Sequence, residues 1–319
     1  MRGRFAPTPS GELHLGGART ALCAWLQARA AGGAFVMRVE DLDRPRAVPG
    51  AEARILEDLR WLGLDWDEGP EVGGPYAPYR QADRLPLYDA AIAKLLAEGK
   101  AFECFCSRKE VQAASQAPHG PADDGPRYPG TCRALSRAEA DDRRNTRLPS
   151  IRLRMEPGVY RWLDGVQGER HDDPAASIGD FVLRRADGIP AYQLAVVVDD
   201  GAMAITDVLR GDDLASSTAR QLALFAALDL APPRFAHVPL LLGPDGARLS
   251  KRHGAIGVRT YAERGVSPER MVGLLAWSLG LAKPDAALHP RELLATFSLA
   301  TIAAAPPSSN LTALLGALK

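Results

Sequence analysis

The sequence lacks long hydrophobic runs and any excess of charge of one sign. No apolar stretch approaches the roughly 18 residues that suggest a membrane-spanning helix, and the segment from Met1 to Pro7 has no apolar region typical of a secretory signal. Lys and Arg number 39, and Asp and Glu also number 39. A protein that coats nucleic acid would be clearly basic, so any RNA partner must be bound by a local patch. We expect a cytosolic protein without a membrane partner.

Cysteine is also scarce, with four residues in 319, which excludes a disulfide-rich scaffold. Three of them, Cys104, Cys106 and Cys132, lie close together in the sequence. In a reducing compartment such spacing favours a metal over a disulfide. These three thiolates and the phenol of Tyr128 could complete a tetrahedral zinc site. A redox pair of cysteines is the alternative, and it leaves Cys132 without a role.

The composition, 46% hydrophobic and 24% charged, is ordinary for a protein with a buried core. Residues 4–8 read as extended chain, and residues 35–39 alternate as a strand. Between them, a helical face is predicted by the spacing of Ala18, Ala21, Leu22, Trp25 and Leu26. Strand, helix and strand in this order predict a βαβ unit and therefore a parallel sheet with a right-handed crossover.

Further elements follow from periodicity and from turn residues. Helices are predicted at residues 51–62, 85–98 and 216–228, and strands at 151–155 and 181–185. The apolar run at 191–200 predicts a fully buried central strand. Residues 113–130 are rich in Pro, Gly, Asp and Ala and predict an exposed loop. The sequence beyond about Gly265 predicts Ala- and Leu-rich helices.

The first motif with chemical content runs from Ala6 to Gly17 and precedes the first long helix. A helix start flanked by glycines presents free N–H groups and a positive dipole end, which suit a phosphate chain. Gly16 and Gly17 would let an adenine ring and ribose lie close to the backbone. His14 could donate to phosphate oxygens as charge builds up at an α-phosphate. The alternative is a Pro- and Gly-rich turn with an incidental histidine.

The second motif, Arg248 to Arg252, follows a turn of sequence Gly-Pro-Asp-Gly. A basic cluster on such a loop can close over β- and γ-phosphates, with Lys251 offsetting the charge of departing pyrophosphate. Taken alone, the same residues could be a solvated basic patch.

Together the two motifs resemble the HIGH-like and KMSKS-like signatures of class I aminoacyl-tRNA synthetases. The residue sequences of three segments are similar to those of the glutamyl branch of this class: Arg4 to Gly11, Arg38 to Asp43, and Tyr192 to Asp200. The resemblance covers about the first 260 residues. It implies an α/β, Rossmann-type catalytic domain that activates an amino acid with ATP and Mg²⁺.

This resemblance also implies a domain organisation. The catalytic domain would comprise residues 1–100 and 186–260, with an inserted zinc-binding, acceptor-type subdomain at 101–185 and a short helical C-terminal extension at 261–319. Since the chain ends at Lys319, we expect no anticodon-binding domain, and we expect a monomer. The sequence therefore resembles the short glutamyl-queuosine tRNA(Asp) synthetase family. Two details agree: Val196 stands where the long enzymes have asparagine, and Gly17 replaces the last histidine of the HIGH pattern.

The resemblance assigns roles to individual residues. Arg4 and Arg210 would bind a carboxylate of glutamate, Glu40 its ammonium group, and Tyr192 would donate a hydrogen bond. The rest of the glutamate pocket would be formed by Phe5, Ala6, Pro7 and Thr8. ATP would be bound by His14, Gly16, Gly17, Ser250 and Lys251, with His14 and Lys251 catalytic. A structural zinc would be held by Cys104, Cys106, Tyr128 and Cys132. Without the resemblance, Arg210 and Glu40 could equally be members of ordinary ion pairs.

The implied reaction is tRNA-independent formation of glutamyl-adenylate, followed by transfer of glutamate to queuosine in the anticodon of tRNA(Asp). A truncated glutamyl-tRNA synthetase that charges a tRNA 3′ end would share the first step. A nucleotidyltransferase outside the synthetases would use the first motif but would not need a glutamate pocket. A non-catalytic binding module of the same fold should have lost His14 or Lys251, and the sequence has both.

Replacement of Lys251 tests the catalytic role of the second motif. We expect Lys251→Ala to lower the rate of glutamate-dependent ATP–pyrophosphate exchange by roughly 100-fold or more, because it removes a cation that acts in the transition state. The dissociation constant for glutamate, measured by calorimetry, should change little. Equal losses in both quantities would contradict this role.

Overall fold

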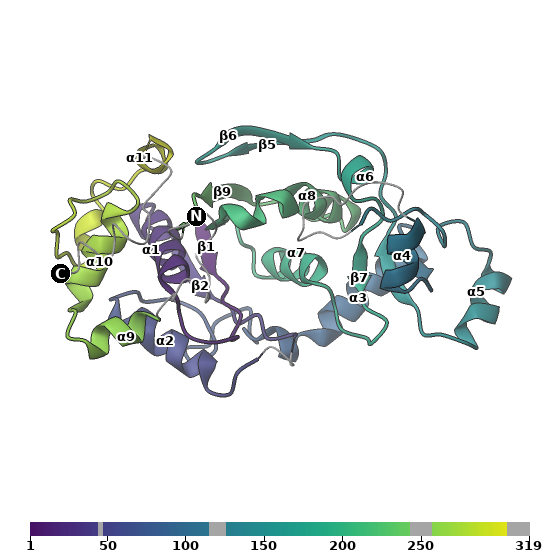
Figure 1. The fold of residues 1–319 in the computed structure, drawn as a ribbon, viewed down its shortest axis with the longest axis horizontal. Coiled ribbons are helices and arrows are strands. Elements are labelled where there is room, and N and C mark those ends of the chain that lie inside the picture. Colours follow the sequence, from purple (N-terminus) through teal and green to yellow (C-terminus); the bar gives the residue numbers. More distant parts are fainter. Residues whose placement is uncertain (44–46, 115–125, 243–256, 305–319) are drawn as a thin grey trace.

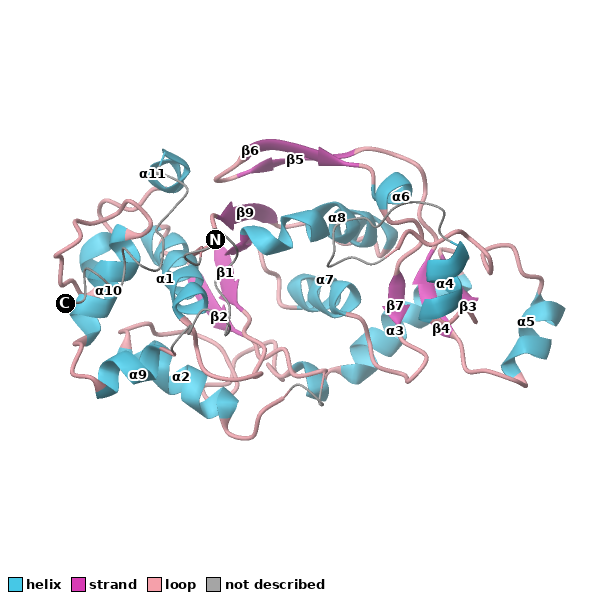
Figure 2. Ribbon diagram, in the orientation of Figure 1, coloured by secondary structure: helices cyan, strands magenta, loops and turns pink. Residues whose placement is uncertain are grey.

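The computed structural model describes residues 1–43, 47–114, 126–242 and 257–304. The molecule is elongated, with a large sheet near its centre (Figure 1). A small sheet with helices α4 (Arg108–Ala114) and α5 (Arg137–Arg144) lies at one end, and helices α9 (Val258–Glu263) and α10 (Pro268–Trp277) lie at the other (Figure 2). No helix within these described ranges is both long and apolar enough to cross a membrane.

The large sheet has six strands in the order β2-β1-β8-β9-β5-β6. Its strands are β1 (Arg2–Phe5), β2 (Ala34–Met37), β5 (Tyr160–Asp164), β6 (Gly168–Asp172), β8 (Asp207–Gly211) and β9 (Arg234–Val238). All neighbouring pairs are parallel except the β5–β6 hairpin at one edge. In α/β proteins, the ligand-binding site usually lies at the carboxyl ends of such parallel strands.

Helix α1 (Leu15–Ala30) connects β1 to β2, and these strands pair in parallel from Arg2 with Ala34 to Phe5 with Met37. The predicted βαβ unit is therefore confirmed. The predicted apolar face of α1 is buried along the whole helix, and Trp25 and Leu26 are fully inaccessible to solvent. The helix ends before Gly32, whose φ of 61° is the left-handed conformation that glycine adopts most easily.

The remaining helices pack around this sheet. They are α2 (Ala51–Trp61), α3 (Leu85–Ala97), α8 (Thr218–Ala227) and α11 (Leu299–Ala304), with 3₁₀ turns at Gln81–Asp83, Asp212–Ser217 and Pro290–Leu293. The helices predicted at 51–62, 85–98 and 216–228 are confirmed within about two residues at each end. Among the described residues there are two large apolar cores, one around α1 and α10 and one around α3, α7 (Tyr192–Ala202) and α8, and a smaller third core around Phe102 and Tyr128.

The strand predicted at 191–200 is wrong, because these residues form helix α7. Every residue from Gln193 to Asp200 is buried. A helix enclosed on all sides has no polar face, so its sequence shows no 3.6-residue period and reads as a buried strand. The consequence matters for the site, since the helix places Tyr192 at its start and Asp199 and Asp200 near its end.

The small sheet is antiparallel, in the order β3 (Ala101–Cys104), β4 (Ser150–Leu153) and β7 (Val182–Arg184). The strands predicted at 151–155 and 181–185 are confirmed. A short helix, α6 (Pro174–Ser177), precedes β7. The β5–β6 hairpin comes from the same stretch of sequence but extends the large sheet. Of the loop predicted at 113–130, residues 115–125 lie outside the described part of the chain.

A buried ionic cluster ties the sheet to α7. Arg38, which follows β2, is completely inaccessible and bonds Asp200 at 2.7 Å and Glu40 at 3.2 Å. Asp199 lies 3.7 Å from the Arg38 Nε atom and accepts from Arg84 at 2.6 Å. Together with the Arg4–Asp200 pair, three arginines face three carboxylates, so the cluster is neutral. The charges of such a buried cluster are compensated only while every partner is present.

Replacement of Arg38, the central cation of the cluster, should therefore lower the stability of the fold. We expect Arg38→Met to lower the free energy of unfolding by about 3–5 kcal/mol, because it leaves carboxylates buried without compensation. The exposed Arg185–Asp187 pair is the control, and Arg185→Met should cost less than about 1 kcal/mol. Guanidinium unfolding followed by circular dichroism measures both, and equal effects would contradict the assignment.

Candidate active site

A cavity of about 480 Å³ lies at the carboxyl ends of β1 and β8. It is where a parallel sheet usually presents its site. The cavity brings together residues that are far apart in the sequence. Of the residues predicted to bind glutamate or ATP, its lining includes Arg4, Phe5, Ala6, Thr8, His14, Gly16, Gly17, Glu40, Tyr192 and Arg210.

Pro7 is the exception among the described members of the predicted pocket. It does not line this cavity but faces a small gap beside Pro9 and Val39. Its carbonyl accepts a hydrogen bond from the backbone N–H of Glu40 at 3.0 Å. Pro7 therefore fixes the backbone of Glu40. Its neighbours Ala6 and Thr8 line the cavity.

His14 forms the N-cap of α1, since its Nδ1 atom accepts from the backbone N–H of Gly17 at 3.0 Å. Nδ1 is thus an acceptor, and in the neutral ring the proton resides on Nε2. A Cβ atom at Gly16 would approach this ring to 3.1 Å, so glycine lets the ring fold back onto the helix start. The positive end of the helix dipole and an imidazole N–H are therefore close together at the cavity.

The second motif, including Ser250 and Lys251, lies outside the described residues. The described chain resumes at Gly257, which forms a β-bridge with His14. The next residue, Val258, donates its N–H to the carbonyl of Leu13 at 2.9 Å. The segment that follows the second motif is therefore attached directly beside the first motif.

Arg4 and Glu40 both belong to the buried ionic cluster. Arg4 makes a two-point pair with Asp200, at 3.2 and 3.1 Å, and Glu40 pairs with Arg38. Burial raises the pKa of Glu40, and Arg38 opposes this shift. Burial would also raise the pKa of Asp200, but Arg4 and Arg38 together hold it below its ordinary value. Both predicted residues therefore face the cavity while already paired on their other side.

Arg210, on β8, is different because its partners are neutral. Its Nε donates to His237 at 3.0 Å, and its terminal nitrogens donate to Gln221 at 2.8 Å and Thr218 at 3.0 Å. Within the described residues, no carboxylate forms an ion pair with it. Burial lowers the pKa of Arg210, and a hydrogen bond with the Tyr192 hydroxyl opposes that shift. Its side chain is almost fully buried, so an uncompensated cation borders the cavity and attracts an anion.

Sequence reasoning missed the residues that hold these arginines. Asp200 was visible only as the end of an apolar run, and Gln221 and Thr218 lie on α8, where nothing in the sequence distinguishes them. His237 and its partner Asp164 come from two different strands. No local motif could indicate them, because their role depends on the order of strands in the sheet.

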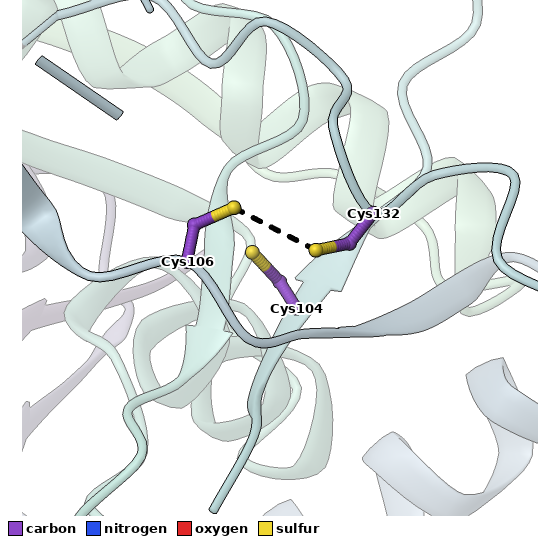
Figure 3. A group of neighbouring side chains, drawn as sticks. All are labelled: Cys104, Cys106 and Cys132. Carbon is purple, nitrogen blue, oxygen red and sulfur yellow. Dashed lines mark hydrogen bonds between the residues drawn. The ribbon is translucent and has the colours of Figure 1, made fainter. Parts of the chain in front are cut away.

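The three clustered cysteines come together at the small sheet (Figure 3). Their sulfur atoms lie within 4.8 Å of one another, and Cys106 and Cys132 are 3.6 Å apart. The Tyr128 hydroxyl lies 3.4 Å from the Cys104 sulfur and accepts from the backbone N–H of Cys132 at 2.8 Å. The three cysteines thus form one group that could hold a metal ion, and the Tyr128 hydroxyl lies beside it.

The electrostatics of this group favour a cation. Burial and the neighbouring Cys104 sulfur raise the pKa of Cys106 to about 12. Burial raises the pKa of Tyr128 as well. Burial would also raise the pKa of Cys104, but hydrogen bonding to Tyr128 and the charge of Arg152 lower it. Three thiolates packed this closely repel one another, and a bound metal ion would relieve that repulsion.

A second cavity, of about 820 Å³, adjoins the cysteine group and reaches Gln193 of α7. Its charged lining is strongly unbalanced, with one acid, Asp180, and five arginines: Arg108, Arg147, Arg152, Arg185 and Arg220. Two of the five form ion pairs with acids, Arg147 with Glu110 and Arg185 with Asp187. The second cavity is therefore moderately basic, and a path of hydrogen bonds leads from it to the first cavity. Gln193 connects the two, since it accepts from Gln221, the partner of Arg210, at 2.9 Å.

Comparison with known proteins matches residues 1–299 to the family described as "tRNA synthetases class I (E and Q), catalytic domain". The chain is 51% identical to the glutamyl-Q tRNA(Asp) synthetase of Symbiobacterium thermophilum, over 98% of both chains. It is 48% identical to the glutamate–tRNA ligase of Heliobacterium modesticaldum, over 96% of this chain and 62% of that protein. The crystal structure of a glutamate tRNA ligase from Elizabethkingia meningosepticum, in complex with its amino acid, superimposes with a TM-score of 0.84. That match has 31% identity and covers 99% of this chain and 68% of that one.

The cysteine group predicts stoichiometric metal in the purified protein. We expect about one equivalent of metal per chain by elemental analysis, and its loss in Cys132→Ser, because three thiolates are needed to hold it. Cys23→Ser is the matched control, since Cys23 is equally buried but lies on α1 outside the group. Tyr128→Phe should release the metal faster to a chelator. Full metal content in Cys132→Ser would exclude the site.

Proposed function

This chain belongs to the class I tRNA synthetase family for glutamate and glutamine, and from this we propose that it activates glutamate with ATP and transfers it to queuosine in the anticodon of tRNA(Asp). The observation that carries the proposal is the 480 Å³ cavity. There an uncompensated buried arginine and a carboxylate face the positive end of α1.

Glutamate has two carboxylates and one ammonium group, and the cavity offers complementary charges. Arg210 supplies a cation held only by neutral partners, so a substrate carboxylate would restore its charge balance. Glu40 supplies a carboxylate for the ammonium group, and Tyr192 a hydroxyl. Arg4, held from behind by Asp200, presents its remaining N–H groups beside them. If Arg210 binds the side-chain carboxylate, an amino acid with a neutral side chain would leave the positive charge of Arg210 buried without a counter-charge. That difference is the physical basis for selecting glutamate.

ATP would bind at the start of α1. The phosphates would meet the backbone N–H groups near Gly16 and Gly17 and the Nε2 proton of His14. Mg²⁺ bound with ATP would screen the phosphate charge. We place Ser250 and Lys251 at the β- and γ-phosphates on the strength of their motif.

The reaction proceeds in two displacements. An oxygen of the glutamate α-carboxylate attacks the α-phosphorus of ATP, the bond from that phosphorus to the bridging oxygen breaks, and pyrophosphate leaves. A hydroxyl of the queuosine cyclopentenediol then attacks the activated carbonyl, and AMP leaves with the bonding electrons. His14 stabilises the negative charge that builds up on the α-phosphate. Positioning of the acceptor accounts for much of the second step, because the adenylate is already reactive.

The choice of acceptor rests on two observations. Identity to the Symbiobacterium glutamyl-Q tRNA(Asp) synthetase extends along 98% of both chains, and a second such enzyme, from Nitratidesulfovibrio vulgaris, is 45% identical over 94% of its length. The arginine-lined 820 Å³ cavity, joined to the catalytic cavity through Gln193 and Gln221, would suit the RNA backbone of either acceptor, so the relatives carry the choice. The second candidate is charging of a tRNA 3′ end, which the similarity to the Heliobacterium glutamate–tRNA ligase favours.

We further propose that the metal is Zn²⁺ and that its role is structural. Thiolate ligands in a four-coordinate set are typical of structural zinc. Three cysteines and Tyr128 would fill that set, so no position would remain for a reacting water. The group also lies on the small sheet, whose strand β3 ends at Cys104.

Transfer of labelled glutamate separates the two acceptors. With ATP and Mg²⁺, we expect label on queuosine-containing tRNA(Asp), and the label should survive removal of the 3′ adenosine. Unmodified tRNA(Asp) is the control and should remain unlabelled. Label at the 3′ end of tRNA(Glu) would instead identify a charging enzyme. Glutamate-dependent ATP–pyrophosphate exchange without transfer to either RNA would support the first step and exclude both acceptors.

A further inference from the structure

Two buried residues outside the predicted pocket lie behind Arg210: His237 contacts it directly, and Asp164 contacts His237. His237, on β9, is inaccessible, and its Nε2 atom accepts from the Arg210 Nε at 3.0 Å. On its other side, the His237 Nδ1 atom lies 2.5 Å from the Asp164 Oδ2 atom. Asp164 ends β5, so three strands of the large sheet each contribute one member of this chain of contacts.

The shorter of two contacts at Nε2 decides the protonation state of His237: Arg210 Nε lies at 3.0 Å and the Thr218 hydroxyl, which can either donate or accept, at 3.4 Å. The Nε–H of Arg210 is always a donor, so Nε2 of the imidazole must have a free lone pair. Nδ1 must then carry the proton and donate it to Asp164. Burial lowers the pKa of His237, which keeps the ring neutral. Burial would raise the pKa of Asp164, but hydrogen bonds from the His237 ring and backbone lower it to about 2, which keeps it an acceptor.

This neutral imidazole has a specific effect on the cavity. It orients the guanidinium without neutralising it, whereas a carboxylate in its place would cancel the charge that a substrate needs to find. Gln221 and Thr218 act in the same way on the terminal nitrogens. Gln221 is itself oriented by donating to Gln193. The plane of the Arg210 guanidinium is therefore determined from three sides by groups of no net charge.

We propose that Asp164 and His237 are positioning residues for substrate binding, which fix the orientation and the uncompensated charge of Arg210 through the Nδ1-protonated tautomer of His237. The inference rests on the proposed function, since it assigns to Arg210 a carboxylate of glutamate. It assigns neither residue a direct contact with the substrate.

Asp164 also has a structural role that any test must separate. Its Oδ1 atom accepts from the backbone N–H groups of Val166, Gln167 and His237. Asp164→Asn can keep these three bonds with its amide oxygen. Its NH₂ group would then face His237 Nδ1 and donate to it. The proton of the ring must move to Nε2, where it meets the N–H of Arg210, donor against donor.

The experiment compares Asp164→Asn, His237→Gln and the double variant in the full chain. We expect Asp164→Asn to raise the KM for glutamate about 10- to 100-fold, with a much smaller change in the KM for ATP. In His237→Gln, an amide oxygen can accept from Arg210 without any tautomer. Because the amide restores the bond to Arg210 but not the ring's contact with Asp164, we expect His237→Gln to raise the KM for glutamate by less than Asp164→Asn does, with little further change when Asp164→Asn is added to it.

Asp207→Asn is the matched control, since it breaks the Asp207–Arg234 pair on β8 and β9, away from the cavity. It should lower the melting temperature without changing the KM for glutamate. Equal effects of Asp164→Asn in both backgrounds, or an unchanged KM in Asp164→Asn, would overturn the proposal.

A spectroscopic readout is independent of activity. The ¹H–¹⁵N correlations of histidine-labelled protein should show His237 protonated on Nδ1 in the wild type and on Nε2 in Asp164→Asn, with the signal assigned by its loss in His237→Gln. An Nε2-protonated ring in the wild type would overturn the inference. A wild-type protein that does not bind glutamate would instead refute the proposed function, and with it the role of Arg210, whatever the tautomer.

Discussion

The site depends on the charge balance around one inaccessible side chain, Arg38. It lies where β2 ends and holds Glu40 and both acids of α7. Asp200 in turn holds Arg4 at the end of β1, so the positions of two cavity residues are consequences of one buried cation. Since every charge in this cluster has a partner, Arg4 and Glu40 together bring no net charge to the cavity that they line. Two other buried arginines that line the cavity, Arg19 and Arg210, have only neutral hydrogen-bond partners among the described residues.

Arg4 and Arg210 show how two identical side chains acquire different roles. Both are nearly inaccessible and both face the cavity. Arg4 is paired with a carboxylate, whereas Arg210 is bordered by an imidazole, an amide, a hydroxyl and the ring of Phe235 at 5.2 Å. Loss of solvent without an anionic partner costs free energy in the empty protein. A bound carboxylate would recover that cost, which is the physical reason for proposing that Arg210 binds a carboxylate of the substrate.

The parts of the fold that could be predicted were those with a local signal. The βαβ unit, three further helices and two strands of the small sheet follow from apolar spacing and from glycine. The structure differs at α7, where burial on every side removes the polar face that would indicate a helix. The hairpin β5–β6 was not predicted either, because apart from Asp164 its side chains are exposed or half-buried, so no buried apolar face indicates its strands. Its pairing with β9 depends on the order of strands in the sheet.

The site residues divide in the same way, into those with a local signal in the sequence and those without one. His14, Gly16, Gly17 and Glu40 belong to contiguous motifs, and the cysteines with Tyr128 form a recognisable spacing, so their gathering was predictable. Asp164, His237 and Gln221 were not, because each acts on Arg210 from a different element. Their chemistry is nevertheless constrained once the fold brings them together. A donor that never loses its proton faces the imidazole on one side and an ionised carboxylate faces it on the other, and only one tautomer satisfies both.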